Sequence, residues 1–232
     1  MNNNIAFKYI KCTTNNQNPI ICVLGCFATE RGIRIKDEML QWLSPQFNTI
    51  LCQQDPNSQL FEYPAIKLAM DVARTKNVNV LYIHTKGAGN PIPYNYKTAM
   101  MAPSIVYPPD ACPEDCQRIV RLMWKKEFSY PCINKYLSLL QDNKPTVVCP
   151  FSGPEHITWQ NGWLMNPLAA CQLYQHYHFS NDRYYYEQVF TQIPSIDVYG
   201  TLLNDFKSNE PDHKRLWDII WSYWDNSIHS MV

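Results

Sequence analysis

The sequence lacks any excess of charge, because Lys and Arg total 20 and Asp and Glu also total 20 among 232 residues. Without a basic surplus, no global field draws the protein to nucleic acid, although a local basic site remains possible. No stretch reaches the ~18 apolar residues that indicate a membrane span. The first twenty residues are Asn-rich and hold no signal-peptide core. We therefore expect a cytoplasmic protein with no transmembrane segment and no nucleic-acid partner.

The cysteines lack the pattern of a disulfide framework. They number nine, an odd count, and Cys22, Cys52 and Cys149 lie inside apolar runs. Buried free thiols in a reducing compartment fit this distribution. Cys112 and Cys116 could form half of a zinc site, but no second Cys or His pair follows at a regular spacing. A thiol or metal enzyme built on this pair stays an alternative.

Apolar runs and helix-like periodicity alternate in the first half of the chain. The continuous run Pro19–Phe27 predicts a central strand covered on both faces. The predicted order is strand 19–27, helix 35–43, strand 48–52, helix 62–75 and strand 78–83. This order is typical of a mostly parallel sheet with crossover helices. With 46% apolar residues, the chain can bury a sizeable core.

The second half gives weaker signals. Residues 88–116 contain six prolines and indicate a long loop, a feature that is often functional. The elements predicted after it are helix 117–140 with a break near Tyr130, strand 145–150, and helices 167–178, 182–193 and 212–228. The last helix is apolar on two adjacent faces, so it packs on the core, forms a homodimer contact or touches a membrane surface.

The strongest functional signal is the turn that follows the strand predicted at 78–83. His84, Thr85, Lys86 and Gly87 come directly after this apolar run. In open α/β sheets, ligands bind at the carboxyl edge, where this turn lies. Taken alone, a His-x-Lys sequence is more often a solvated lysine beside a histidine with a structural role.

The turn and its neighbourhood resemble a known family. Glu62-Tyr63-Pro64 at a helix start, followed by Leu-Tyr-Ile-His-Thr-Lys-Gly at 81–87, is similar to the "HTKG" group of bacterial and viral polysaccharide-type glycosyltransferases. The likeness covers roughly residues 19 to 193 and includes segments 121–127, 158–165 and 183–190. It implies a GT-A-like fold, a nucleotide-binding α/β sandwich. It also implies transfer of a sugar from a nucleotide-sugar donor to a glycan or lipid-linked acceptor.

This resemblance divides a single domain into three parts. Residues 19–87 would form the nucleotide-binding half and residues 88–193 the acceptor-side half. Residues 194–232 would be a C-terminal helical extension. Because a fold does not fix an activity, a non-catalytic nucleotide- or glycan-binding domain on the same fold is the alternative.

The resemblance also bears on the donor diphosphate. In many GT-A enzymes an Asp-x-Asp turn ends the corresponding strand and holds Mn or Mg against the diphosphate. This sequence contains no Asp-x-Asp, and His84-x-Lys86 takes that place. The leaving diphosphate gains negative charge, which either a metal or a lysine can stabilise. Lys86 would then contact the diphosphate, and His84 would donate to it or ligate a divalent metal.

Further donor contacts are expected around the same edge. Thr29 and Arg31 follow the first strand of the sheet and are candidates for contacts to base, ribose or phosphate, although an ordinary connection is as good an interpretation. Glu62 either recognises the donor or is favoured at its helix start by the dipole. The complete donor-binding set is Thr29, Arg31, Glu62, His84, Thr85, Lys86 and Gly87.

Inversion, our expectation for the transfer, requires a base that removes the proton of the acceptor hydroxyl. We rank Glu187 first and Glu155 second, beside Lys86 in the catalytic set, and either glutamate could instead be a surface carboxylate. Acceptor binding is assigned to His156, Trp159, Asn161 and Trp163. Indole rings pack against the C–H faces of sugars, but the two tryptophans could equally be core residues.

Overall fold

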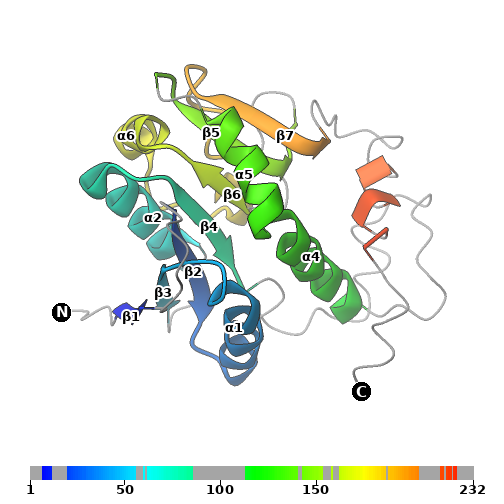
Figure 1. Ribbon diagram of the computed structural model, residues 1–232. Helices are drawn as coiled ribbons and strands as arrows, with labels where there is room; N and C mark the ends of the chain where they lie inside the picture. The colour runs from blue at the N-terminus through cyan, green and yellow to red at the C-terminus, as the bar shows by residue number, and fades with distance from the viewer. Residues whose placement is uncertain are drawn as a thin grey trace.

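The computed structural model describes residues 7–11, 20–55, 60, 62–85, 113–140, 143–153, 158, 162–186, 188–203, 215–216, 218–220 and 222–223 (Figure 1). These residues form an α/β structure in which a mixed sheet is flanked by helices on both faces. None of the helices in these ranges combines the length and the apolar composition needed to cross a membrane.

The sheet has seven strands in the order β1-β3-β2-β4-β6-β5-β7. Their bounds are β1 Phe7–Lys11, β2 Ile21–Phe27, β3 Thr49–Asp55, β4 Val80–His84, β5 Thr146–Phe151, β6 Trp163–Met165 and β7 Asp197–Leu203. β2 is parallel to both β3 and β4, and β5 is parallel to β7. β6 is antiparallel to both β4 and β5, and β1 is antiparallel to β3. All strands except β1 and β6 therefore run in one direction.

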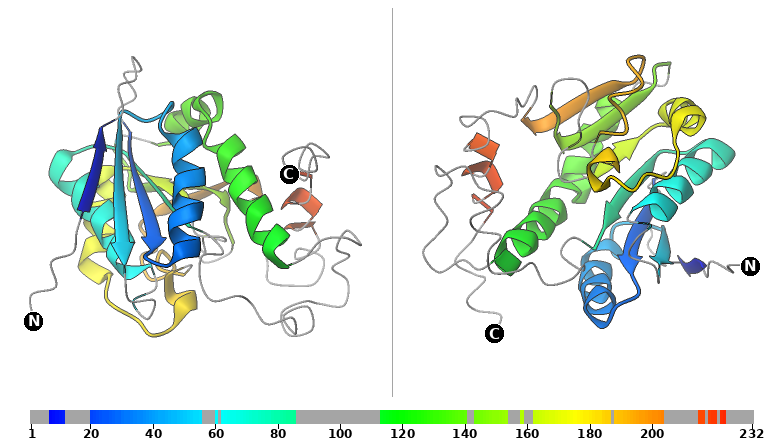
Figure 2. Two further views of the ribbon diagram at one scale, coloured as in Figure 1. Left: turned by 90° about the horizontal axis from the view of Figure 1, so that it is seen from below. Right: turned by 180° about the vertical axis from the view of Figure 1, so that it is seen from behind.

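The helices cover the two faces of the sheet unequally. Their bounds are α1 Glu30–Leu43, α2 Tyr63–Lys76, α4 Pro113–Glu127, α5 Tyr130–Leu139 and α6 Pro167–His176. α1, α4 and α5 share one core cluster, and α2 and α6 share the other. Figure 2 shows α1 and α4 on one side of the strands, with α2 and α6 on the other. The helices lie on both faces because the crossover from β2 to β3 through α1 and the crossover from β3 to β4 through α2 run in opposite directions along the sheet, and both are right-handed.

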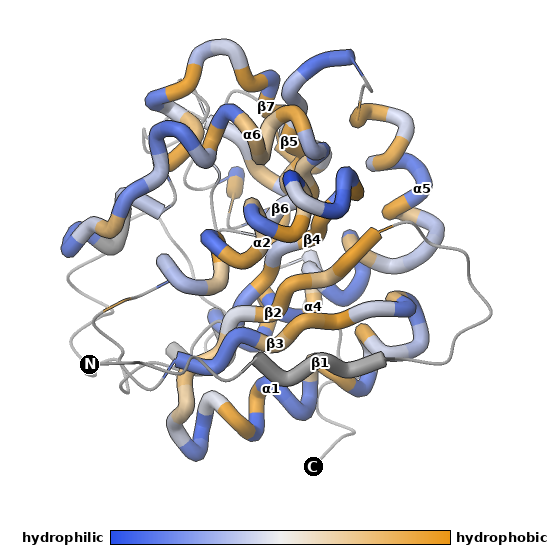
Figure 3. The backbone as a smooth tube through the Cα atoms, turned by 90° about the vertical axis from the view of Figure 1, so that its left-hand side faces the viewer, coloured by the Kyte–Doolittle hydropathy of each residue, from blue (hydrophilic) through white to orange (hydrophobic). Residues whose placement is uncertain are grey.

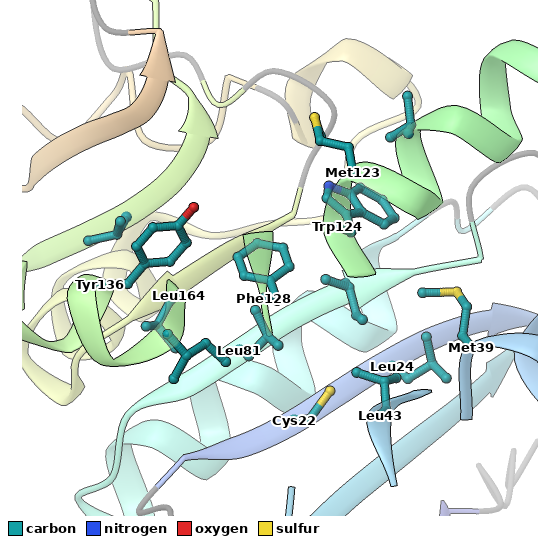
Figure 4. Packing of buried hydrophobic residues seen from close by; sticks show 14 of the residues in the cluster. Cys22, Leu24, Met39, Leu43, Leu81, Met123, Trp124, Phe128, Tyr136 and Leu164 are labelled. Atoms are coloured by element: carbon teal, nitrogen blue, oxygen red, sulfur yellow. The ribbon is translucent and has the colours of Figure 1, made fainter. Parts of the chain in front are cut away.

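Alternation along the central strands explains the two clusters. Cys22 and Leu24 of β2 belong to the cluster under α1, whereas Val23 belongs to the cluster under α2. Figure 3 shows that the central strands are hydrophobic over most of their length, whereas α1 alternates between hydrophobic and hydrophilic residues. In the close-up of Figure 4, side chains of α1 and α4 meet on β2 and β4.

Local signals set the helix ends. Thr29 is the N-cap of α1, and its hydroxyl accepts a hydrogen bond from the Gly32 N–H at 3.0 Å. Pro64 occupies the first turn of α2, where a missing N–H costs nothing. Asn77 ends α2 in the left-handed region, with φ of 52°.

Most elements predicted from the sequence are confirmed. Strands predicted at 19–27, 48–52, 78–83 and 145–150 correspond to β2, β3, β4 and β5. Helices predicted at 35–43, 62–75, 117–140 and 167–178 correspond to α1, α2, the α4–α5 pair and α6. The break near Tyr130 is also confirmed, because α5 begins there.

The helix predicted at 182–193 is wrong. In the described residues 182–186 and 188–193, the one helical element is a 3-10 turn, η4 at Arg183–Tyr186, and further turns follow it. The Tyr186 hydroxyl donates to the carbonyl of Ser180, and the Tyr185 hydroxyl accepts from the backbone N–H of His178. These phenols therefore hold the preceding loop, which competes with regular helix formation.

Three further predictions need adjustment. The C-terminal helical extension predicted at 194–232 is wrong in its first part, because Asp197–Leu203 form β7, which pairs with β5 in the sheet. The predicted loop 88–116 lies outside the described residues up to 112, and 113–116 already belong to α4. Of the helix predicted at 212–228, residues 215–216, 218–220 and 222–223 are described. Leu216 and Ile220 are buried in the cluster shared with α4 and α5, so this described part packs on the core.

Candidate functional site at the carboxyl edge

The order of the strands creates a switch point between β2 and β4. These two strands are parallel neighbours. The strand that follows β2 in the chain, β3, lies on one side, whereas β5, β6 and β7, which follow β4, lie on the other. Connections that diverge in this way leave a crevice at the carboxyl ends of the strands, where ligands bind in open α/β sheets.

A small hollow, partly open to solvent, lies at this point. Its walls come from the ends of β2, β3 and β4 and from the first turn of α2. The residues that line it are Gly25, Cys26, Phe27, Gln53, Asp55, Glu62, Pro64, Ala65, Tyr82, His84 and Thr85. Three residues of the predicted donor set, Glu62, His84 and Thr85, are thus brought together.

Close packing of α2 on β2 gives the hollow its shape. A Cβ atom at Gly25 would lie 2.8 Å from the Cβ of Ala65, a contact too short for two carbon atoms. Glycine at this position lets the first turn of α2 approach the end of β2. This approach places Glu62, which precedes the helix, beside the end of β4.

Glu62 links two side chains of β4. The Tyr82 hydroxyl donates to Glu62 Oε2 at 2.9 Å, and His84 Nε2 lies 3.5 Å from Glu62 Oε1. The Tyr82 and His84 rings are nearly parallel, with centroids 6.2 Å apart. Burial, together with the Glu62 carboxylate, raises the pKa of Tyr82 well above its usual value, so the phenol remains a donor. Glu62 therefore orients the imidazole of His84 at the rim of the hollow.

Thr85 fixes the point at which the chain leaves β4. Its backbone N–H donates to the carbonyl of Gly25 at 2.8 Å, and the residue is buried. This bond continues the β2–β4 pairing by one residue, so Thr85 lies at the switch point. Lys86 and Gly87 themselves lie outside the described residues.

Thr29 and Arg31 do not line the hollow. The cap that Thr29 provides to α1 accounts for its hydroxyl without a ligand. Arg31 lies on the α1 side of the edge, close enough to Arg121 and Arg118 for their charges to interact. Burial lowers the pKa of Arg121, and Glu38, whose carboxylate lies 3.6 Å from its guanidinium, opposes that effect. Arginines of α1 and α4 therefore form a basic region on the face of the sheet that α1 and α4 cover.

Trp163 was expected to bind the acceptor, and the structure corrects this assignment. The residue is fully buried, and its ring packs on Tyr82 at 4.8 Å and on Phe190 at 5.5 Å between centroids. A ring with no exposed face cannot stack on a sugar. Trp163 is a core residue that supports β4 from β6.

Most of the remaining predicted residues lie outside the described part of the chain, namely Glu155, His156, Trp159, Asn161 and Glu187. The described residues around the first four can be placed. Ser152 and Thr158 form an isolated antiparallel bridge directly after β5, and Gly162 precedes β6. Because β5 ends and β6 begins at the carboxyl edge, these flanking residues lie at the same edge as the hollow.

Trp124 connects that region to His84. Its ring centroid lies 5.5 Å from that of His84, and a Cβ atom at Gly162 would lie 2.7 Å from its Nε1. Trp124 is completely buried, and its indole N–H has no hydrogen-bond partner within the part of the chain that the structure describes. Gly162, which flanks the predicted acceptor segment, and His84, predicted to bind the donor, therefore both pack against the Trp124 ring.

Sequence reasoning missed Gln53, Asp55 and Tyr82. The strand was predicted to end at Cys52, so the polar residues after it were read as a loop. The available signal was alternation, because Leu51, Gln53 and Asp55 occupy every second position and share one face of β3.

Among the described residues, no group of three or more His, Cys, Asp or Glu side chains is arranged to hold a metal ion. The suggested zinc pair cannot be placed, because Cys112 and the side chain of Cys116 lie outside the described part. Cys22, Cys52 and Cys149 are buried free thiols, as predicted. Comparisons of the chain with protein-family models, curated proteins and solved structures gave no match.

Proposed function

We propose that the protein is a glycosyltransferase with a GT-A-like fold, which moves a sugar from a nucleotide-sugar donor to a glycan or lipid-linked acceptor. One observation carries the proposal: a hollow at the β2–β4 switch point has His84, held by Glu62, at its rim. Such crevices bind nucleotides in open α/β sheets. The resemblance of the turn at 84–87 supplies the reaction type.

The chemistry asks for positive charge next to the departing diphosphate. Lys86 follows the fixed Thr85, and His84 lies beside it, so both would contact the phosphates in our mechanism. Arg31 is a third candidate from the basic region near α4. Mn or Mg bound through His84 is the alternative source of charge.

The acceptor would approach from the segments that flank Gly162 and the Ser152–Thr158 bridge. His156, Trp159 and Asn161 would bind it there. Glu187 or Glu155 would remove the proton of the attacking hydroxyl, and direct displacement would invert the anomeric centre. Because the six described cysteines are all free thiols, we also propose a cytoplasmic location.

The first test measures ligand binding and turnover. A panel of nucleoside diphosphates and nucleotide sugars, with and without manganese, should include at least one compound that raises the melting temperature. The same donor should release its nucleoside diphosphate on incubation with enzyme and acceptor. If a nucleotide binds but no donor turns over, the alternative of a non-catalytic binding domain replaces this proposal.

The second test removes the proposed cation. Lys86→Ala should lower donor turnover by about 100-fold, the typical loss when a group that stabilises transition-state charge is removed. Lys76→Ala is the matched control, because Lys76 ends α2 at the opposite edge of the sheet. Equal turnover in the two variants would exclude the diphosphate role of Lys86.

A further inference from the structure

An exposed aromatic ring lies beside the start of α2. Phe179 is 40% exposed, and its ring meets that of Tyr63 edge to face, with 5.7 Å between the two centroids. Tyr63 directly follows Glu62 and precedes Pro64, and both of these neighbours line the hollow. One exposed ring is ordinary on a protein surface, so its surroundings decide whether it serves a ligand.

The loop that carries Phe179 lies at the carboxyl edge of the sheet. β6 is antiparallel to β4 and runs away from that edge, so α6, which follows β6, returns toward it. Residues 177–182 come directly after α6. The Tyr177 hydroxyl donates to the carbonyl of Tyr63 at 3.2 Å, and the two rings are stacked with centroids 5.2 Å apart. These contacts hold the loop against the first turn of α2, next to the proposed transfer site.

Two buried tyrosines of η4 fix the loop on both sides of Phe179. The Tyr185 hydroxyl accepts a hydrogen bond from the backbone N–H of His178 at 3.2 Å. The Tyr186 hydroxyl accepts from the backbone N–H of Ser180 at 3.2 Å and donates to the carbonyl of the same residue at 2.9 Å. A loop that is already ordered loses little conformational entropy when a ligand binds. The exposed ring is therefore preorganised for binding.

The side chains that precede and follow Phe179 are polar and can donate or accept hydrogen bonds. The exposed polar residues between 175 and 182 are Gln175, His176, His178, Asn181 and Asp182. A standard protein interface buries about 800 Å² on each partner around an apolar centre, which the described residues of this loop do not provide. A sugar matches the loop better, because the C–H face of a pyranose packs on an aromatic ring and its hydroxyls bond to polar groups around that ring.

We propose that the loop at 177–182 binds one sugar of the acceptor glycan, with the exposed ring of Phe179 stacking on the pyranose. The inference rests on the proposed function and adds an acceptor contact away from the reacting hydroxyl. Tyr186, which fixes the loop, directly precedes Glu187, the proposed base, in the chain. Phe179 would thus take the stacking role that Trp163, a buried core residue, cannot perform.

The first experiment identifies an oligosaccharide and measures its binding. An array of defined oligosaccharides that contain neutral hexoses, N-acetylhexosamines or uronic acids is probed with the full-length protein. At least one should bind, and Phe179→Ala should weaken its binding by about tenfold, the loss expected for one aromatic contact. Calorimetry measures both dissociation constants. Absence of binding to every oligosaccharide, or wild-type affinity in the variant, would overturn the inference.

Two further substitutions of Phe179 separate stacking from folding. Phe179→Tyr keeps an aromatic ring and should bind the same oligosaccharide as the wild type does. Phe179→Leu keeps apolar bulk without a flat ring and should bind as weakly as Phe179→Ala. Tyr174→Ala is the matched control, because Tyr174 is also 40% exposed but the guanidinium of Arg74 lies 4.1 Å from the centre of its ring. Equal affinity in the Leu and Tyr substitutions, or an equal loss in the control, would contradict stacking on Phe179.

Acceptor kinetics distinguish failure of this inference from failure of the proposed function. With a donor that turns over, Phe179→Ala should raise the KM for the oligosaccharide by about tenfold, because the contact is lost from the ground state and the transition state alike. Turnover with an unchanged KM would overturn the inference and leave the proposed function intact. If no donor turns over, the proposed function fails, whereas weaker oligosaccharide binding by Phe179→Ala would still support a glycan-binding loop.

Discussion

Glu62 and Glu127 both accept hydrogen bonds from tyrosine hydroxyls, but their surroundings differ. Glu62 accepts from Tyr82 and faces His84 at the rim of the hollow. Glu127, at the end of α4, accepts from Tyr136 and, at 2.6 Å, from Tyr223. Both are carboxylates paired with phenols. They differ in their next neighbour, which is the His84 imidazole for Glu62 and a second phenol, Tyr223, for Glu127.

The Glu127 cluster is closed. The Thr201 hydroxyl donates to the Tyr136 hydroxyl at 2.8 Å, and the ammonium of Lys126 lies 5.0 Å from the centre of the Tyr223 ring. Glu127 itself is 8% exposed. Its partners come from α5 and from the segment at 222–223, and Thr201 of β7 reaches it through Tyr136, so the cluster joins separate elements. Glu62 instead adds a titratable imidazole and an opening, which are the features of a ligand site.

The largest expected effect is on stability at the closed cluster. Glu127→Ala leaves the Tyr136 and Tyr223 hydroxyls without their acceptor, which we expect to lower the free energy of unfolding by about 3 kcal/mol. Chemical denaturation measures this change. Donor turnover per folded molecule should stay close to that of the wild type. A loss below about 1 kcal/mol would show that the cluster does not stabilise the fold.

The next largest effect tests the approach of α2 to β2. Gly25→Ala should lower the free energy of unfolding by about 2 kcal/mol, because the new methyl group overlaps Ala65. It should also displace Glu62 from His84 and reduce nucleotide binding. Combining it with Ala65→Gly, which returns the lost space, should restore both properties in large part. Absence of this rescue would contradict the packing explanation.

A smaller effect is expected when Glu62 and Glu127 are each replaced by glutamine and donor turnover is compared. Glu62→Gln keeps the shape and an acceptor for Tyr82, so we expect less than about 1 kcal/mol of destabilisation. Turnover should fall about tenfold, since the negative charge that faces His84 is lost. Glu127→Gln is the matched control and should leave turnover unchanged. If both variants lose activity equally, the contrast between the clusters is wrong.

The smallest effect concerns alkaline pH. Burial, with Glu127 as acceptor, raises the pKa of Tyr136 and of Tyr223 above the unfolded value of about 10. The folded state then holds these protons more tightly, so the stabilisation is complete below about pH 10 and is lost as the pH rises through the folded-state pKa values. Tyr223→Phe removes one titrating group. Its unfolding free energy should fall less steeply than that of the wild type between about pH 9 and 11.

The strands and helices of the first half could be predicted because their signals are local. An apolar run such as 19–27 indicates a buried strand wherever it lies, and Pro64 marks a helix start by its own geometry. The helix predicted at 182–193 was wrong because its tyrosines bond to a loop rather than to their own segment. Bonding of these tyrosines depends on His178 and Ser180, which lie before the segment whose periodicity predicted the helix.

The site was predictable only in part. The position of His84 follows from the strand that precedes it, but its contact with Glu62 depends on how closely α2 approaches β2. Trp163 could not be assigned from composition, because tryptophans serve both cores and sugar sites. Asp55 was missed because a polar residue at a strand end looks like the start of a loop.

The bond between Tyr223 and Glu127 spans 96 residues of chain. During synthesis, the glutamate leaves the ribosome long before the second phenol that it binds. Docking of the segment that contains Tyr223 must therefore wait until the chain has been made to that point, and non-local contacts of this kind form slowly. Nascent chains halted before this tyrosine would carry a half-satisfied carboxylate on the end of α4.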